Sequence, residues 1–378
     1  MIIFVSILLV IFLFAPDFYI FYTFVSNQPI RWISICYWLP QIIAIALIVF
    51  FAFEGNQSVK FRHIGYASFV LLCLQLPKLV FTICSLIGKI GGLLHIPTQI
   101  FTIVGLLIGA ATLATLLYGC FIELYNFKVK HVELACHNLP KNFDGYKIVH
   151  ISDIHSGSWN SNGQQLQKAV SLINDQQADI VCFTGDLVTN NHTEVDPFFS
   201  ILQSISAKDG VYSILGNHDY SFMISSPDTL KKLIEKEKNI GWRLLLDEHE
   251  IITRGDEKIA ILGVENVGHS PFPHIGNLKK ASRGTEEMFQ ILLSHDPTHW
   301  REEVIPQTDI ALTLSGHTHA GQCDLPFLSI SKKSYPEHRG FYRVDNQSLY
   351  VNPGLGFTFF PIRIGARPEI TVITLCSD

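Results

Sequence analysis

The sequence predicts an α/β domain of two packed sheets with helices outside, preceded by a bundle of about four transmembrane helices. Two observations predict this fold class. The N-terminal part of the chain is almost wholly apolar, and it raises the hydrophobic content of the 378 residues to 48%. The remainder alternates apolar strands with helices, which is the pattern of layered α/β domains. We therefore expect a transmembrane region at residues 1–124 and a second domain at residues 125–378.

Four apolar runs make up the predicted transmembrane region: residues 1–24, 33–53, 66–87 and 96–122. Each run is near or above the roughly 20 residues that are needed to cross the hydrocarbon core of a bilayer. A cleaved signal peptide is the alternative for the first run, but that run lacks a basic start and a small-residue cleavage site. Asp17 interrupts it, so it is the least regular of the four.

The distribution of Lys and Arg around these runs predicts the orientation of the chain. Four spans place both chain ends on one side, together with Lys60, Arg62, Lys128 and Lys130, and leave Arg31 and Lys89 on the other side. The positive-inside rule then predicts an integral membrane protein whose second domain faces the cytoplasm.

Lys78 lies within the third apolar run, directly after Pro77. A charge at membrane depth is a candidate functional site. The alternative is a proline-kinked helix whose lysine reaches the interface or faces the interior of the bundle. The sequence leaves both interpretations open.

Charge and cysteine content exclude other classes of protein. The net charge is −5 and long basic runs are absent from the sequence, so we expect no nucleic-acid partner. The eight cysteines form no Cys-x-x-Cys motif, which favours reduced thiols over a disulfide framework.

Five apolar strands of the second domain end on residues that commonly bind metals. These residues are Asp153 and His155 after the first strand, Asp186 after the second, Asn217, His218 and Asp219 after the third, His295 after the fourth, and His317 and His319 after the fifth. Because open α/β sheets place their chemistry at the carboxyl ends of their strands, we expect one sheet to assemble these side chains into a metal site.

Mixed carboxylate and imidazole ligands suit first-row metals such as Mn, Fe or Zn better than Mg or Ca. Asp186 follows Gly185, where the missing side chain lets the backbone turn closely. One carboxylate has two oxygens and can bridge two ions. Two ions about 3.5–4 Å apart can hold a phosphoryl group, stabilise its charge and activate a hydroxide.

Other segments are predicted to support or surround this site. Helical spacing is present at residues 163–177, 195–205 and 230–240, and strands with short connections follow Trp242. His150 is interior to the first site strand, so we expect it in the core. Five other histidines are predicted to be loop or surface residues: His192, His269, His274, His299 and His338.

The ordered blocks Asp153-x-His155, Gly185-Asp186, Gly216-Asn217-His218-Asp219, His295 and Gly316-His317-Thr318-His319 resemble the calcineurin-like metallophosphoesterase superfamily. Within it, three segments are similar to the membrane-associated bacterial YkuE/YaeI-like subgroup: 315–322, 352–356 and 367–370. The resemblance implies a four-layer α-β-β-α sandwich and, for the bacterial subgroup, the inner membrane. That subgroup usually has Gly where this chain has Ala320.

The resemblance also implies a role for each site residue. One metal is assigned to Asp153, His155, Asp186 and His319, and the second to Asp186, Asn217, His295 and His317. His218 is the catalytic residue that stabilises the transition state or protonates the leaving oxygen, and Asp219 orients it. The implied cofactors are two divalent transition-metal ions, manganese first and iron or zinc as alternatives, with a metal-bridging hydroxide as nucleophile.

These observations predict a membrane-tethered phosphoesterase that acts on a phosphate-containing small molecule or lipid. The membrane region favours a lipid-linked phosphate ester or pyrophosphate, but a nucleotide or a protein phosphate stays open. The alternatives are a non-catalytic scaffold, and a membrane sensor or transporter that the second domain regulates. Residues 357–367 are either an aromatic and cationic loop for a lipid phosphate or a packed turn with surface arginines.

Overall fold

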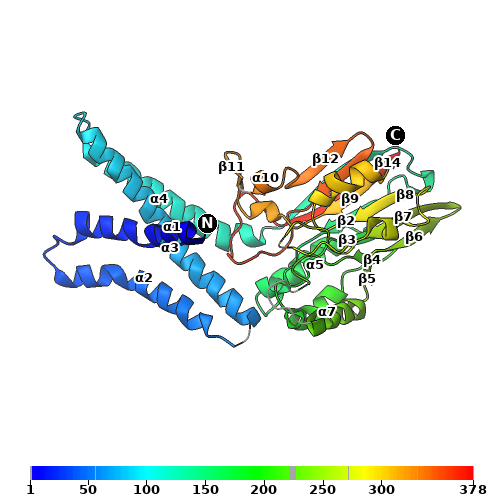
Figure 1. The fold of residues 1–378 in the computed structure, drawn as a ribbon, viewed down its shortest axis with the longest axis horizontal. Coiled ribbons are helices and arrows are strands. Elements are labelled where there is room, and N and C mark those ends of the chain that lie inside the picture. The colour runs from blue at the N-terminus through cyan, green and yellow to red at the C-terminus, as the bar shows by residue number, and fades with distance from the viewer. Residues whose placement is uncertain (1, 56, 221–226, 271, 330, 378) are drawn as a thin grey trace. The chain divides into compact units, whose positions relative to one another are not determined.

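The computed structural model describes residues 2–55, 57–220, 227–270, 272–329 and 331–377. The chain divides into two compact units. Figure 1 shows the ribbon of the whole chain, coloured from blue at the N-terminus to red at the C-terminus. The first unit contains Met1–Ile122 together with Phe359–Ile362. The second unit contains Glu123–Thr358 and Arg363–Asp378.

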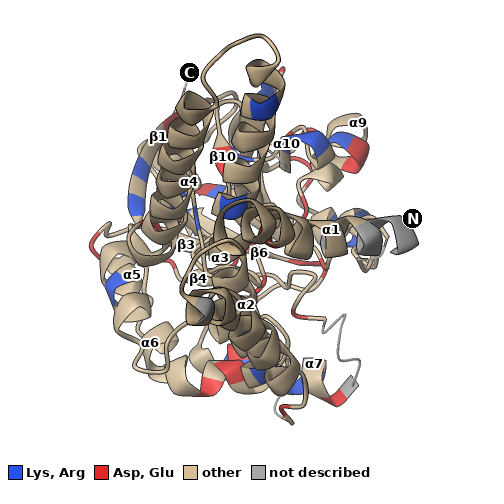
Figure 2. Cartoon of the chain, turned by 90° about the vertical axis from the view of Figure 1, so that its left-hand side faces the viewer, with Lys and Arg blue, Asp and Glu red and all other residues tan. Residues whose placement is uncertain are grey.

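The first unit is built from four apolar helices. They are α1 (Ile2–Ile20), which continues into the π-helix η1 (Phe21–Val25), α2 (Arg31–Ala52), α3 (Gln57–Gly92) and α4 (Thr98–Phe121). The predicted set of about four helices is confirmed. Within the described residues, three segments are long and apolar enough to cross a membrane: Trp32–Ala52, Val59–Gly92 and Thr98–Tyr125. The apolar segment Val10–Val25 is shorter. Figure 2 shows α2 and α4 almost free of charged residues.

Two glycines of α4 allow a close approach to α3. A Cβ at Gly109 would lie 3.1 Å from the Pro77 carbonyl oxygen, and a Cβ at Gly105 would lie 2.9 Å from the Cys84 Cβ. Helices in lipid associate through such small residues, because the hydrophobic effect does not drive helix against helix there.

The second unit contains two six-stranded sheets. The first has the order β1 (Lys128–Cys136), β14 (Glu369–Ser377), β2 (Lys147–Ile151), β3 (Ile180–Phe183), β4 (Val211–Ser213) and β5 (Arg243–Leu244). The second has the order β12 (Gly340–Val344), β13 (Gln347–Val351), β9 (Leu312–Ser315), β8 (Phe289–Leu293), β7 (Glu257–Gly263) and β6 (Glu248–Arg254). A short hairpin joins β10 (Asp324–Leu325) to β11 (Leu328–Ser329).

Parallel pairing is concentrated where the site strands lie. Strands β2, β3, β4 and β5 are parallel neighbours, and so are β7, β8, β9 and β13. Antiparallel pairs join β14 to β2, β6 to β7, and β12 to β13. The five site strands are therefore divided between two sheets, and the expectation that one sheet assembles the site is wrong.

Alternating side chains of the strands build the layers. Ile148 of β2 faces Ile261 of β7 in the core between the sheets, whereas Val149 points to the opposite face. That outer face is covered by α5 (Gln164–Asn174), α6 (Phe199–Gln203) and α7 (Pro227–Ile240). Trp300 and α8 (Leu278–Ser282) pack on the outside of the second sheet. The four-layer α-β-β-α arrangement is confirmed.

Short helices occupy the loops between these elements. They are η2 (Glu123–Tyr125), η3 (Lys141–Phe143), η4 (Ser156–Ser158), η5 (His192–Phe198), η6 (Trp300–Val304), α9 (Ile305–Gln307), η7 (His319–Gly321) and α10 (Ser331–Ser334). The helices predicted at 163–177 and 230–240 are α5 and α7. The one predicted at 195–205 is divided between η5 and α6, and it contains Pro197.

Candidate metal centre

The seven predicted ligands come together at the carboxyl ends of β2, β3, β4, β8 and β9. Each ligand has a donor atom within 3.8 Å of a donor atom of another. Five of them are at most 2% exposed, whereas His319 is 6% exposed and His317 is partly exposed. The cluster is therefore largely closed to solvent, and His317 is at its open side.

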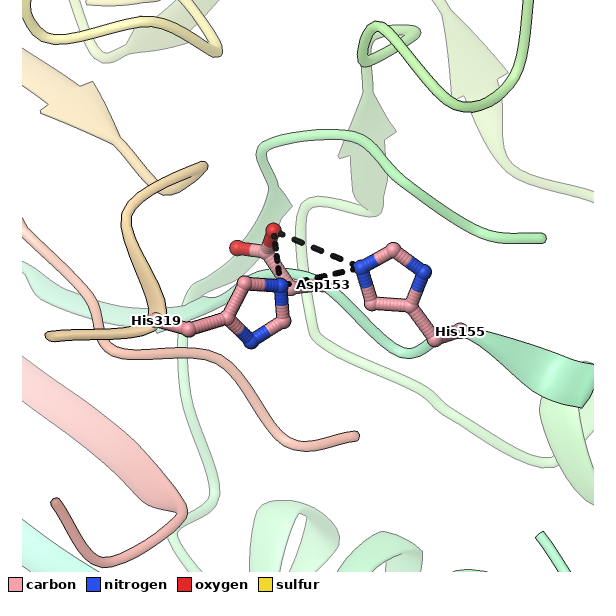
Figure 3. Close-up of side chains that lie close together, drawn as sticks. All are labelled: Asp153, His155 and His319. Carbon is pink, nitrogen blue, oxygen red and sulfur yellow. Dashed lines mark hydrogen bonds and ion pairs between the residues drawn. The ribbon is translucent and has the colours of Figure 1, made fainter. Parts of the chain in front are cut away.

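Asp153, His155 and His319 form the first group of donors (Figure 3). The Nε2 atoms of His155 and His319 are 3.0 Å apart, and the Asp153 Oδ1 lies 3.8 Å and 3.3 Å from them. This Oδ1 is buried and accepts no hydrogen bond from the described residues. A buried carboxylate oxygen that faces two imidazole nitrogens fits a bound cation.

His295, Asn217 and His317 form a second group. The Asn217 Oδ1 is 3.1 Å from the His295 Nε2 and 2.7 Å from the His317 Nδ1. An amide oxygen between two imidazoles supplies a neutral oxygen ligand beside two nitrogen ligands. This set of donors also fits a borderline first-row metal.

Asp186 lies between the two groups. Its Oδ2 is 3.6 Å from the His155 Nε2 and 3.2 Å from the His295 Nε2. Its Oδ1 accepts a hydrogen bond from the His218 backbone N–H at 2.8 Å. One carboxylate is thus shared by both groups of histidines, as a bridging ligand requires.

The backbone of the site is strained. Five of the ligands have positive φ angles: Asp153 (50°), His155 (46°), Asp186 (60°), His317 (69°) and His319 (49°). Non-glycine residues rarely adopt this left-handed conformation, and such strain clusters at functional sites. Ala320 also has a φ of 49°, a conformation that glycine adopts with less strain.

Two glycines are required by the close packing of the ligand loops. A Cβ at Gly216 would lie 2.3 Å from the Asp186 Oδ1. A Cβ at Gly316 would lie 1.8 Å from the Ser152 Oγ and 2.4 Å from the Asp153 Oδ2. Any larger residue at either position would displace a ligand carboxylate.

Hydrogen bonds from outside the cluster orient the imidazoles. The His295 Nδ1 donates to the Thr184 carbonyl at 2.6 Å, so its Nε2 faces Asp186. The His317 Nε2 lies 2.8 Å from the Tyr335 hydroxyl, so its Nδ1 faces Asn217. Such partners select the tautomer of a ligand histidine. Tyr335 was missed from the sequence, because it follows α10 and stands in no motif.

His218 and Asp219 do not form the expected pair. The His218 Nδ1 donates to the Thr189 carbonyl at 2.8 Å. The Asp219 carboxylate instead accepts the backbone N–H groups of Asp186, Val188 and Gly216 at 2.8–3.0 Å. Asp219 therefore holds the loops that carry Asp186 and Asn217, and the prediction that it orients the His218 ring is wrong.

His218 also lies close enough to act as a donor. His155, Asp186 and His218 offer ligand atoms that lie within 4.8 Å of one another. Thr189 engages Nδ1, and Nε2 has no hydrogen-bond partner among the residues that the structure describes. His218 is partly exposed, so it lies on the open side of the site with His317.

Burial keeps most of these imidazoles neutral. It lowers the pKa of His155 to about 3 and that of His317 to about 4. It also lowers the pKa of His319. A neutral imidazole has the free lone pair that a metal needs. Burial opposes charge on His295 too, but the Asp186 carboxylate outweighs it and raises the His295 pKa to about 10.

Other sequence predictions near the site have mixed outcomes. His150 is fully buried beside Thr184, as expected. His299, expected in a loop or at the surface, is buried beside Ser294. Arg363 is fully buried and donates to the carbonyls of Gly356, Pro353 and Ala366. One of the two interpretations of residues 357–367 placed its arginines at the surface, and this interpretation does not hold for Arg363.

Comparisons with known proteins agree with this geometry. Residues 146–321 match the family "Calcineurin-like phosphoesterase", and residues 1–123 match "Probable Calcineurin-like phosphoesterase, transmembrane domain". The uncharacterized metallophosphoesterase YkuE of Bacillus subtilis is 32% identical over 273 residues, which cover 69% of this chain and 89% of YkuE. The chain belongs to the calcineurin-like metallophosphoesterases.

The family also includes relatives with membrane segments. A transmembrane protein with metallophosphoesterase domain from Danio rerio is 31% identical over 68% of this chain, and the match spans 59% of that relative. A dimetal phosphatase structure from the same organism aligns at 12% identity with a TM-score of 0.36, over 56% of this chain and 88% of that one. That likeness is too low to support an argument. The chain is an integral membrane metallophosphoesterase with a candidate dimetal site.

Proposed function

We propose that this protein is a membrane-anchored phosphoesterase that uses two metal ions to hydrolyse a phosphate ester or pyrophosphate bond. The observation that carries the proposal is the position of Asp186, whose Oδ2 lies between His155 and His295 of the two donor groups. Asp153, His155, Asp186 and His319 would hold one ion, and Asp186, Asn217, His295 and His317 would hold the other. When bound, such a pair of ions polarises phosphoryl oxygens and lowers the pKa of the attacking water.

The residues of the chain orient the substrate and supply the proton. His218 is on the open side of the site, with its Nδ1 held by the Thr189 carbonyl and its Nε2 unbonded among the described residues. A protonated Nε2 would donate to the oxygen of the leaving group, which is the part of general acid. Asp219 is a positioning residue that holds the loops of Asp186 and Gly216.

The natural substrate is proposed to be a phosphate-containing lipid or small molecule. The four apolar helices keep the domain at a bilayer, which favours a lipid-linked phosphate. The domain is proposed to face the cytoplasm, and for a bacterial cell the membrane would be the inner one. A cysteine added after residue 378 would test on which side of the membrane the domain lies. A membrane-impermeant thiol reagent added to intact cells labels this cysteine only if the domain faces the outside.

The test of the activity is hydrolysis of nitrophenyl phosphate esters and of a lipid pyrophosphate by the full-length protein, with metal content measured on the same sample. Two ions of manganese, iron or zinc per chain with turnover would support the proposal. Two bound ions without turnover on any of these phosphates would favour a non-catalytic scaffold. A protein that binds one ion or none after reconstitution would contradict the dimetal site.

A further inference from the structure

Helices α1 and α2 both pack against α3 in the first unit, and a polar cluster lies between these helices. Lys78 of α3 donates to the Asp17 Oδ1 of α1 at 2.6 Å. The Tyr37 hydroxyl of α2 donates to the Asp17 carbonyl at 3.2 Å, and the Gln41 Nε2 donates to the Leu13 carbonyl at 2.6 Å. Lys78 therefore faces the interior of the bundle, as one of the two sequence interpretations expected.

Four polar side chains in the central part of α3 lie on one face of the helix. Gln75, Lys78, Thr82 and Ser85 are spaced by three or four residues, which places them on a single stripe. Ser85 continues the stripe by a 2.8 Å hydrogen bond to the Tyr19 hydroxyl of α1. Apolar residues such as Val70 and Ile83 are exposed elsewhere on the helix.

Several polar atoms of this cluster are buried without a partner among the described residues. They are the Asp17 Oδ2, the Gln41 Oε1, both amide atoms of Gln75 and the Thr82 Oγ1. Asp17 and Gln75 are 0% exposed, Gln41 is 2% exposed and Thr82 is 7% exposed. Because a bilayer core supplies no water, unsatisfied polar groups there are strongly unfavourable. These atoms are therefore available to a ligand that has matching hydrogen-bonding groups.

Charge and hydrogen-bonding capacity define the class of that ligand. The Asp17–Lys78 pair is neutral, so a charged ligand would bring an uncompensated charge into the membrane. Three of the five unpartnered atoms are pure acceptors, one is a donor and the Thr82 hydroxyl is both. A hydroxyl group, which donates and accepts without a net charge, matches this set.

We propose that the first unit contains an intramembrane binding site for an uncharged hydroxyl-bearing ligand, formed by Asp17, Gln41, Gln75, Lys78 and Thr82. The hydroxyls come either from the headgroup of a neutral glycolipid or from water that enters the bundle. Binding of this ligand uses none of the metal-binding residues, and it does not depend on the proposed phosphoesterase activity.

The test compares variants of the full-length protein in nanodiscs of phosphatidylcholine, with and without monoglucosyl-diacylglycerol. Gln75→Leu and Thr82→Val remove unpartnered polar atoms, and Thr82→Val is the milder change. Thr115→Val is the matched control, because the Thr115 hydroxyl is exposed on α4 and already donates to the Ala111 carbonyl. Unfolding of this unit is followed by alkylation of Cys120, which is buried on α4.

An occupied site loses ligand contacts in both variants, so we expect the unfolding midpoint to fall by about 4 °C or more while the control stays unchanged. If the midpoint falls only in nanodiscs that contain the glycolipid, the ligand is the lipid headgroup. If it falls equally in nanodiscs with and without the glycolipid, the ligand is water. If the site is empty, the midpoint of both variants should stay the same or rise, because replacing a buried polar atom that has no partner by an apolar one is neutral or stabilising. An unchanged or raised midpoint in both lipids would overturn the proposal.

Discussion

Asp186 is the residue on which both groups of metal-binding side chains depend. Its Oδ2 faces His155 on one side and His295 on the other. We predict that Asp186→Ala removes both ions together, because each ion loses the same carboxylate. Elemental analysis of the purified variant measures this, with Asp175→Ala, an exposed carboxylate after α5, as the control. Retention of two ions would show that Asp186 is not the bridge.

His218 separates proton transfer from metal binding. Its Nδ1 is fixed by Thr189, and its Nε2, which has no partner in the described part of the chain, can either donate a proton or bind an ion. We predict that His218→Asn keeps both ions but lowers turnover by about 10²–10⁴-fold. The loss should be smaller for nitrophenyl esters, whose leaving group needs less protonation. If an ion is lost in parallel with turnover, His218 is a ligand and not the general acid.

The residue scale also shows what the sequence could and could not predict. An apolar strand that ends on Asp or His is a local pattern, so the sequence could single out the side chains that the structure brings together. The partners of the imidazoles depend on the path of distant loops. Thr189 and Tyr335 therefore carry no signal in the sequence, and Asp219 was assigned to His218 although it binds backbone N–H groups instead.

At the scale of elements, α7 carries a buried carboxyl group behind the site. Glu237 is fully buried, and burial raises its pKa from 4.5 to about 8. Between these values the unfolded chain releases a proton that the folded chain keeps, so this group lowers stability as the pH rises from about 4.5 towards 8.

We therefore predict that Glu237→Gln stabilises the protein more at pH 8 than at pH 5, as judged by the free energy of unfolding of the variant minus that of the unaltered protein. The difference between the two pH values should be a few kcal/mol, since each pKa unit corresponds to about 1.4 kcal/mol. Urea unfolding followed by tryptophan fluorescence at both pH values measures the difference. Glu235→Gln, an exposed position on the same helix, is the control and should show no such dependence. Equal effects of Glu237→Gln at both pH values would contradict the raised pKa.

The contact between α3 and α4 is a second prediction at this scale. Because a Cβ at Gly105 would lie 2.9 Å from the Cys84 Cβ, Gly105→Val should push the helices apart and destabilise the first unit by about 1–3 kcal/mol. Ala110→Val adds bulk on the exposed face of α4 and is the control. Alkylation of Cys120 during heating measures both variants; equal midpoints would show that the packing tolerates the valine.

The elements themselves were largely predictable, because periodicity is local. The strands and α5 follow directly from apolar spacing, whereas the division of the site strands between two sheets depends on pairing between distant segments. The same limit applies in the first unit. The stripe of Gln75, Lys78 and Thr82 is visible in the sequence, but its partner Asp17 lies 61 residues from Lys78.

For the whole molecule, the proposed lipid substrate would share a membrane with the first unit. An enzyme and a lipid that share one bilayer meet by diffusion in two dimensions, so the surface mole fraction of the lipid replaces its bulk concentration. A soluble ester reaches the same site from water and is unaffected by dilution of the lipid. The two classes of substrate can therefore be separated by kinetics on the unaltered protein.

We predict that turnover of a lipid-linked phosphate by the protein in vesicles depends on its surface mole fraction and not on the total lipid concentration. A soluble nitrophenyl phosphate, measured in the same vesicles, should show no change when phosphatidylcholine is added. Asp186→Ala in identical vesicles is the negative control, because hydrolysis of the lipid-linked phosphate and hydrolysis of the nitrophenyl phosphate both require the metal centre. If the lipid-linked substrate follows bulk concentration, or is hydrolysed no better than the soluble ester at any mole fraction, the membrane unit does not serve to present lipid substrates. The natural substrate would then be sought among soluble phosphates, with the metal centre and its chemistry unchanged.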